Sequence, residues 1–341
     1  MNDFFNTIRV FLLEYLPKQR SYSNNTIRSY RQALNLLIEF IQLKKHLKIK
    51  DISFDIITRE LIIEFLDWLE QERNCSINTR NQRLMAIRAF FNFSGDYDCT
   101  NIALSINIQK VRSKKQPTKI VEHLSENALK IFLLQPDSTT KIGLRNLCFM
   151  ILMYDTAARC GELLNLKLSD LDLDTQYPIA YLHGKGNKTR TVPLSKKTVQ
   201  YCKQYISIYH TTDFSTDDAP LFYTVIHGKH QPMSPDTVAL FFKKYGNLAY
   251  SQCSEMPERM HPHILRHTRA MHLYQHGMPL MLLSDYMGHS NVETTRIYAY
   301  ADTEMKRNAI NKADATLSNV QHVQPIWAND EEMILKLSGL A

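Results

Sequence analysis

A short basic stretch divides this chain into two regions with different sequence patterns. The stretch, residues 110–119, contains no acidic residue and holds Pro117. Its cations are Lys110, Arg112, Lys114, Lys115 and Lys119. With 341 residues the chain is long enough for two domains. We therefore expect a domain at residues 1–108, a basic linker at 109–122, a second domain at 123–316 and a tail at 317–341.

The first region has the apolar spacing of an all-helical domain. Apolar residues recur at helical intervals in a set made up of Ile27, Tyr30, Leu34, Leu37, Ile38 and Ile41. Ser23 or Asn25 is the expected cap of that helix, because short polar side chains accept hydrogen bonds from a helix's first amide groups. Residues 61–69 and 77–91 repeat the helical spacing.

The second region mixes helical and extended patterns. Residues 179–183 and 189–194 are β-rich runs on either side of Gly184-Lys185-Gly186-Asn187, which predicts a hairpin. Helices are expected at 141–157, from Ser234-Pro235 to about Tyr245, and from Pro262 to about His276. Gly277 and Gly288 are expected to end helices.

Composition narrows the class of protein. Hydrophobic residues make up 44% of the chain, enough for packed cores, so a disordered protein is excluded. The six cysteines include no C-x-x-C pair, which argues against a zinc site or a disulfide framework and fits reduced thiols. No signal-peptide layout is present, and the longest apolar run, Leu147–Tyr154, is too short to span a membrane. We expect a cytoplasmic protein without membrane contact; the net charge of +7 weakly favours a nucleic-acid partner.

Four segments in a fixed order carry the polar chemistry of the second region. They are residues 158–163, 184–188, 263–267 and 288–289, followed by a tyrosine nine positions after the last. The reactive side chains that they supply are Arg159, Lys185, His263, Arg266, His289 and Tyr298. Metal-free cleavage of a phosphodiester requires such a set. Arginines bind the non-bridging oxygens through paired hydrogen bonds, and a lysine or histidine can move a proton.

These segments resemble the motifs of the tyrosine recombinase (phage integrase) family, over roughly residues 20–310. Residues 184–194 look like the family's β-hairpin, and residues 265–268 and 287–290 read like two of its later motifs. At the first motif Arg159 and Glu162 are kept, although their neighbours differ from the usual pattern. The resemblance implies a mainly α, two-domain DNA clamp. Its N-terminal part is a helical core-binding (SAM-like) domain, and its C-terminal part is a mixed α/β catalytic domain with a small antiparallel sheet.

The resemblance also implies a role for each reactive residue. Tyr298 attacks the scissile phosphate and forms a 3′-phosphotyrosyl bond, and Lys185 protonates the leaving 5′-oxygen. Arg159 and Arg266 bind the non-bridging oxygens, with the two histidines of the set assisting. The bond energy is kept in the covalent intermediate, so neither a metal nor another cofactor is implied.

Alternatives stay open at several positions. Lys188 competes with Lys185 on the same turn, and Tyr300 competes with Tyr298. The alternative for Arg159 is a helix-end arginine that pairs with a nearby carboxylate. The pairs 263/267 and 272/276 have the histidine spacing of zinc helices, but no glutamate follows in the H-E-x-x-H manner. We expect no metal there, and the resemblance assigns His267 to support of the fold.

Basic and polar residues of the first region and the linker are candidate DNA contacts. They are Arg28, Arg31, Thr79, Arg80, Asn81, Arg83, Arg88, Lys114 and Lys115. Cations that displace condensed counterions from DNA give salt-dependent affinity. The alternative is a solvated helix face and, for the linker, a flexible tether.

The implied partners are double-stranded DNA and further copies of the chain, as a homotetramer on two DNA sites. Met333, Ile334 and Leu337 share one face of a short helix, so the tail is expected to dock on its own domain or on a neighbouring copy, and the resemblance favours the second. An integrase or transposase of a mobile element is the favoured role. An Xer-like chromosome or plasmid dimer resolvase or a DNA invertase is the alternative. A type IB topoisomerase or a non-catalytic DNA-binding protein is less favoured.

Overall fold

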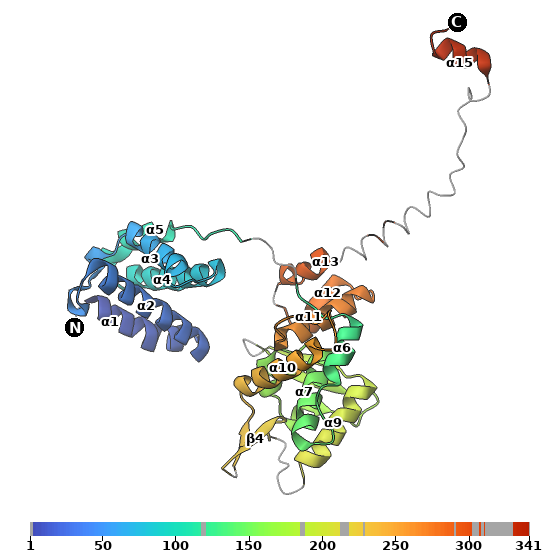
Figure 1. Cartoon of the computed structure of the whole chain (residues 1–341). Coiled ribbons are helices and arrows are strands. Elements are labelled where there is room, and N and C mark those ends of the chain that lie inside the picture. The colour runs from blue at the N-terminus through green and yellow to red at the C-terminus, as the bar shows by residue number, and fades with distance from the viewer. Residues whose placement is uncertain are drawn as a thin grey trace. The chain divides into compact units, whose positions relative to one another are not determined.

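The chain forms two compact units, Met1–Thr118 (unit 1) and Lys119–Ala341 (unit 2), in a computed structural model (Figure 1). The residues that the structure describes are 3–116, 121–184, 188–211, 218–227, 229–289, 291–301, 307, 310 and 330–340. The division falls within the stretch expected as the linker. No helix among these residues is long and apolar enough to cross a lipid bilayer.

Unit 1 is helical throughout its described elements. They are α1 Asp3–Val10, the π-helix Phe11–Gln19, α2 Asn24–Lys45, the short 3₁₀ turns Ile49–Asp51 and Phe54–Ile56, α3 Arg59–Gln71, α4 Ile77–Tyr97, the 3₁₀ turn Cys99–Asn101 and α5 Ile102–Gln109. Three helices have the same type of N-cap. The side chains of Ser23, Thr58 and Ser76 accept hydrogen bonds from backbone amides of α2, α3 and α4. The expected cap at Ser23 is confirmed.

Aromatic side chains fill the core of unit 1. Phe4, Phe11 and Phe90 are fully buried, and their rings meet edge to face. Phe65 and Phe40 extend the cluster between α2 and α3. Each such ring removes a large apolar area from water, and its edge-to-face contacts add further stabilisation. The core explains why the helical spacing of the sequence is realised as a bundle.

Unit 2 combines helices with two small antiparallel sheets. Its elements are α6 Glu126–Leu133, α7 Lys141–Thr156, α8 Cys160–Leu164, the 3₁₀ turn Leu168–Asp170, β1 Leu171–Asp172, β2 Ile179–His183, β3 Thr189–Pro193, α9 Lys196–Tyr209, β4 Tyr223–Ile226, β5 Lys229–Pro232, α10 Pro235–Tyr250, α11 Pro262–Gln275, α12 Leu280–Met287, the 3₁₀ turn Val292–Thr294, α13 Arg296–Ala301 and α15 Glu331–Leu337. One sheet has the order β1-β2-β3, and the other pairs β4 with β5. The expected mainly α fold with a small antiparallel sheet is confirmed.

Several expected boundaries in unit 2 are confirmed. The β2–β3 hairpin pairs Leu182 with Arg190, as the β-rich runs predicted. Ser234 caps α10, which extends to Tyr250 rather than to Tyr245. Gly277 and Gly288 take positive φ angles of 92° and 63° just after α11 and α12, a conformation that glycine adopts without steric cost. The β4–β5 hairpin was not expected from the sequence.

Helix α7 is the central element of unit 2. Most of its residues are buried, and it packs against α9 and α11. It ends at Ala157, whose left-handed φ of 48° turns the chain directly into α8. This turn brings residues that follow α7 next to Arg266 of α11 and the end of α12.

Candidate active site

Arg159 is set at the start of α8 by a carboxylate three residues later. Its backbone amide donates to Glu162 Oε2 at 2.8 Å, and its Nη1 donates to Glu162 Oε1 at 2.7 Å. The Arg159 side chain remains 40% exposed, whereas the Glu162 side chain is 5% exposed. The buried carboxylate therefore holds an arginine that still faces solvent.

Arg266 enters the same region from α11. Its side chain is buried and donates to the carbonyl oxygens of Ala157 at 2.5 Å and Met287 at 2.6 Å. Burial and the nearby Arg159 charge lower the pKa of Arg266 to about 10, so the guanidinium stays charged at neutral pH. The end of α7, the end of α12 and the middle of α11 are thus joined through one side chain.

The turn after α12 supplies a further contact and a histidine. The carbonyl of Gly288 accepts from Arg159 Nη2 at 3.2 Å. His289 Nδ1 lies 2.8 Å from the hydroxyl of Thr295. Burial, together with the charges of Arg266 and Arg159, lowers the pKa of His289 to about 4. His289 is therefore neutral at physiological pH.

Tyr298 is enclosed in this structure. Its side chain is fully buried in a cluster with Ala270 and Met287, and its hydroxyl lies 2.8 Å from His267 Nδ1. Burial raises the pKa of Tyr298 to about 12 although Arg266 opposes this, and burial with neighbouring charges lowers the pKa of His267 to about 4. A neutral His267 and a protonated Tyr298 are thus joined by a hydrogen bond. His267, expected only to support the fold, directly holds the candidate nucleophile.

The structure brings five of the six candidates into one neighbourhood. The charges of Arg159 and Arg266 act on both His263 and His289, and Arg266 also acts on Tyr298. Lys185 lies outside the described residues. The side chain of Tyr300, the alternative to Tyr298, lies outside them as well. The base of the Lys185 turn is described, because the amide of Gly184 donates to the carbonyl of Lys188 at 2.8 Å.

Arg190 is a member of this site that the sequence analysis did not single out. It lies on β3 and donates from Nη1 and Nη2 to the two oxygens of Glu162, at 3.1 and 2.8 Å. Burial opposes ionisation of Glu162, but the hydrogen bonds from Arg190 and Arg159 prevail and lower its pKa to about 2. One signal was available: alternate residues of a strand point to the same face, so Arg190 and Val192 share a face of β3.

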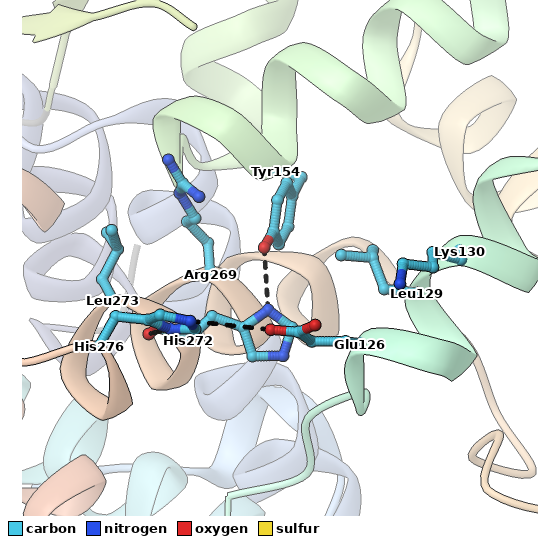
Figure 2. A pocket seen from close by; sticks show the side chains of 8 residues that line it. All are labelled: Glu126, Leu129, Lys130, Tyr154, Arg269, His272, Leu273 and His276. Carbon is cyan, nitrogen blue, oxygen red and sulfur yellow. Dashed lines mark hydrogen bonds and ion pairs between the residues drawn. The ribbon is translucent and has the colours of Figure 1, made fainter.

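The C-terminal half of α11 contributes to a further polar cluster around a cavity of about 310 Å³ (Figure 2). The hydroxyl of Tyr154 lies 2.8 Å from His272 Nδ1, and His272 Nε2 lies 3.0 Å from the carbonyl of Leu124. Both ring nitrogens of His272 are therefore engaged. His276 lies 3.8 Å from a carboxylate oxygen of Glu126. Among the described residues no group of three or more His, Cys, Asp or Glu side chains is arranged to hold a metal ion.

The candidate DNA contacts of unit 1 fall into two groups. Arg28, Arg31 and Lys115 are exposed. The side chains of the other candidates form contacts within unit 1. Arg80 is buried and pairs with Glu70 at 3.1 Å, Arg83 binds Ser29 and Gln32, and Arg88 binds the carbonyl of Val111. Asn81 exchanges hydrogen bonds with the backbone of Lys114, Lys114 also pairs with Glu70 at 2.5 Å, and the hydroxyl of Thr79 lies 3.1 Å from that of Ser76.

Comparison with known proteins identifies the family. The model of the phage integrase family matches residues 122–305, more than half of the chain. The chain belongs to the phage integrase family of tyrosine recombinases. The model of the N-terminal SAM-like domain of phage integrases matches residues 11–95 as well. A tyrosine recombinase breaks and rejoins DNA strands, and this chain is an enzyme of that kind.

The relatives of this tyrosine recombinase span nearly its whole length. A putative integrase/recombinase of Sinorhizobium fredii is 28% identical over 97% of this chain and 96% of its own. Tyrosine recombinase XerD of Vibrio cholerae is 26% identical over 86% of this chain and 91% of its own.

Solved structures share the fold of this tyrosine recombinase. The XerH site-specific recombinase bound to palindromic difH substrate has a TM-score of 0.69 at 23% identity, covering 89% of this chain and 84% of that chain. The Tn1549 transposon integrase in complex with transposon right end DNA has a TM-score of 0.67 at 18% identity, covering 90% of this chain and 98% of that chain.

Proposed function

We propose that this tyrosine recombinase is the integrase or transposase of a mobile element, and that it cuts duplex DNA through a 3′-phosphotyrosyl intermediate. The observation that carries the catalytic part is the convergence of Arg159 and Arg266 beside His289 and Tyr298. Two guanidiniums held in place by neighbouring carbonyl and carboxylate oxygens match the charge that develops on the oxygens of a phosphoryl transition state.

Each described residue has a stated role in the proposed reaction. The phenolic oxygen of Tyr298 bonds to the scissile phosphorus, the bond from phosphorus to the 5′-oxygen breaks, and that oxygen takes a proton. Arg159 and Arg266 bind the non-bridging oxygens, and His263 and His289 assist them. Lys185 is the proposed proton donor. In the second half a 5′-hydroxyl of a partner strand attacks the phosphotyrosine and releases the phenol.

The enclosed Tyr298 sets a requirement on this reaction. Its pKa of about 12 keeps it protonated, and its hydroxyl is held by His267, so it is not yet a nucleophile. Binding of DNA must therefore accompany a movement of α13 that breaks the contact with His267. The proposed reaction needs neither a metal nor ATP.

Partners follow from the same proposal. Double-stranded DNA is bound by both units, with the exposed Arg28, Arg31 and Lys115 as the first contacts to test in unit 1. Exchange between two duplexes needs a homotetramer. The tail at 317–341 is proposed to dock on a neighbouring copy through α15, whose Met333, Ile334, Leu335 and Leu337 are exposed.

The biological role rests on relatives of two kinds. Support for an integrase comes from the Sinorhizobium fredii relative, a putative integrase/recombinase that matches almost the entire chain. Support for the alternative, an Xer-like resolvase, comes from the similarity to Vibrio cholerae XerD. Recombination assays on plasmids separate the two: joining of unlike sites supports the first role, and joining only of identical paired sites supports the second.

The first experiment uses nicked suicide DNA substrates taken from the ends of the gene's own genetic neighbourhood, in EDTA. Wild-type protein should form a covalent protein–DNA complex, and Tyr298→Phe should form none while still binding DNA. Tyr300→Phe is the matched control and should behave like wild type. A complex formed by Tyr298→Phe and lost in Tyr300→Phe would move the nucleophile to Tyr300.

A truncation tests the tail. Deleting residues 321–341 should lower tetramer formation on DNA, measured by sedimentation, more than it lowers the affinity of one protomer for one site. Unchanged tetramer formation would remove the proposed docking in trans.

A further inference from the structure

The end of α12 presents a row of acceptors to three arginines. The carbonyl of Tyr286 accepts from Arg190 Nε at 3.1 Å, that of Met287 from Arg266 at 2.6 Å, and that of Gly288 from Arg159 at 3.2 Å. The last carbonyls of a helix lack partners within the helix and carry the negative end of its dipole. They therefore suit cations, and the three arginines come from three different elements.

Arg190 differs from Arg159 in what its guanidinium faces. Its side chain is 13% exposed, and all three of its nitrogens donate to the protein: Nε to Tyr286, Nη1 and Nη2 to Glu162. The side chain of Arg159, by contrast, is 40% exposed. Each nitrogen of Arg190 already donates within the protein and the side chain is largely buried, so its effect on the reaction passes through its neighbours.

Glu162 is the neighbour through which Arg190 acts. Both carboxylate oxygens are shared, Oε1 between the guanidiniums of Arg159 and Arg190, and Oε2 between Arg190 and the Arg159 amide. A buried carboxylate needs a cation partner. Without Arg190 the whole charge of Glu162 would draw on Arg159, in competition with a phosphate.

Close packing fixes Arg190 in this place. A methyl group added to Gly288 would lie 2.9 Å from Arg190 Nη1 and 3.1 Å from Cδ, so the side chain fills the space beside the turn. Arg190 is also paired with Leu182 across the β2–β3 hairpin. The hairpin that leads to residues 185–187 is therefore tied to the same carboxylate and the same helix end.

We propose that Arg190 is a positioning residue of the cleavage reaction. It neutralises Glu162 and fixes the end of α12, and in this way it keeps the Arg159 guanidinium available to a DNA phosphate oxygen. This inference rests on the proposed function, because it concerns a step of the same strand cleavage.

The test compares Arg190→Met, which keeps the side-chain volume without the charge, with Arg190→Lys. The rate of covalent complex formation on the suicide substrate is measured under single-turnover conditions, and the Kd for the same DNA is measured separately. Arg190→Met should slow cleavage by about 100-fold, as a small misplacement of a binding group does, with Kd changed by less than threefold. Arg190→Lys should recover part of the rate. The control is Lys203→Met, which removes an exposed ion pair with Asp174 in the same unit and should change neither value.

A double variant separates positioning from mere packing. If Arg190 prevents Glu162 from capturing Arg159, Arg190→Met/Glu162→Gln should cleave faster than Arg190→Met alone. A packing role predicts that the double variant is no faster and that Arg190→Lys fails to recover the rate, and this result would overturn the inference. If Arg190→Met does not fold, the other two variants decide between the two roles. Arg190→Lys keeps the positive charge, and the double variant removes the buried negative charge of Glu162.

The outcomes for the two proposals are distinct. A wild-type complex with unchanged rates for Arg190→Met overturns the positioning role alone. Absence of a covalent complex with wild-type protein on substrates that it binds overturns the proposed function, and the inference with it.

Discussion

The charges of the clustered arginines are compensated differently in the two units. In unit 1, Arg80 pairs with Glu70, whose carboxylate also holds Lys114, and Asp67 lies 4.0 Å from the same lysine. Two cations therefore face two carboxylates, and the cluster needs no further anion. Such a pair supports the fold, because removing either member would leave a buried charge without its partner.

In unit 2 the arginines exceed the carboxylates that bind them. Arg159 and Arg190 share Glu162, while Arg266 binds the neutral carbonyls of Ala157 and Met287. The charges repel one another, as the effect of Arg159 on the pKa of Arg266 shows. We propose that an anion from outside, the DNA phosphate of the proposed reaction, completes this cluster.

The largest expected effect is the loss of cleavage rate in Arg266→Ala, and its absence would contradict the comparison of the two arginine clusters. Arg266→Ala should slow covalent complex formation by about 100- to 1000-fold, the usual result of removing one fixed donor to a transition-state oxygen. Single-turnover cleavage on the suicide substrate measures it. Arg80→Ala is the matched variant in unit 1 and should leave the rate per bound, folded enzyme within about threefold of wild type. Equal losses from both variants would show that the two clusters do not differ in function.

The second prediction concerns stability. Arg80→Met should lower the free energy of unfolding of unit 1 by about 1–3 kcal/mol, because Glu70 would lose one of its partners in a poorly solvated place. Urea unfolding of the full chain in a Trp327→Phe background, followed by the fluorescence of Trp68, reports on unit 1. Lys44→Met removes an exposed pair with Glu72 and should cost less than about 1 kcal/mol. Similar costs for the two variants would argue against a structural role for Arg80.

The third and smallest expected effect is a dependence of the free energy of unfolding on pH, which sharpens the comparison of the two units. The pKa of His267 is lowered to about 4 in the folded protein, whereas its ordinary value is 6.5. The unfolded chain therefore binds more protons between these values, so the free energy of unfolding should fall as pH drops from 6.5 toward 4. His289 adds an effect of the same sign. The effect belongs to unit 2, because the only histidine before residue 119 is His46.

His267→Gln tests this pH dependence. The variant should show a flatter loss of stability between pH 6.5 and pH 4 than wild type, in urea unfolding at a series of pH values. His276→Gln is a suitable control, since that ring is largely exposed and far less desolvated. A slope that His267→Gln leaves unchanged would mean that other groups carry the acid sensitivity.

Local features of the fold could be predicted from the sequence, and distant ones could not. Caps such as Ser23 and Ser234, and the glycines that end α11 and α12, act over three or four residues, so their signals lie in short segments. The β2–β3 hairpin was equally local. The β4–β5 hairpin was missed because no tight-turn dipeptide marks it.

The site was only partly predictable for the same reason. The reactive residues stand in recognisable motifs, but their contacts join segments far apart in the chain. Arg190 reaches Glu162 across 28 positions, and His267 reaches Tyr298 across 31. Whether an arginine is paired or available is likewise decided by packing, as the buried Arg80 and the half-exposed Arg159 demonstrate.

The three acceptors at the end of α12 have a consequence for how this protein tolerates mutation. Carbonyl oxygens belong to every residue type, so no side-chain substitution at Tyr286 or Met287 deletes them. An alanine scan of α12 would report lost packing and would not detect the orientation of the arginines. Semisynthesis with an ester in place of the peptide bond that follows Met287 would weaken that acceptor, and it would also remove the hydrogen bond from the Gly288 amide to the carbonyl of Asp285. Backbone carbonyl groups thus help to set the geometry of the arginines, and side-chain substitutions, whether engineered or natural, do not remove these groups.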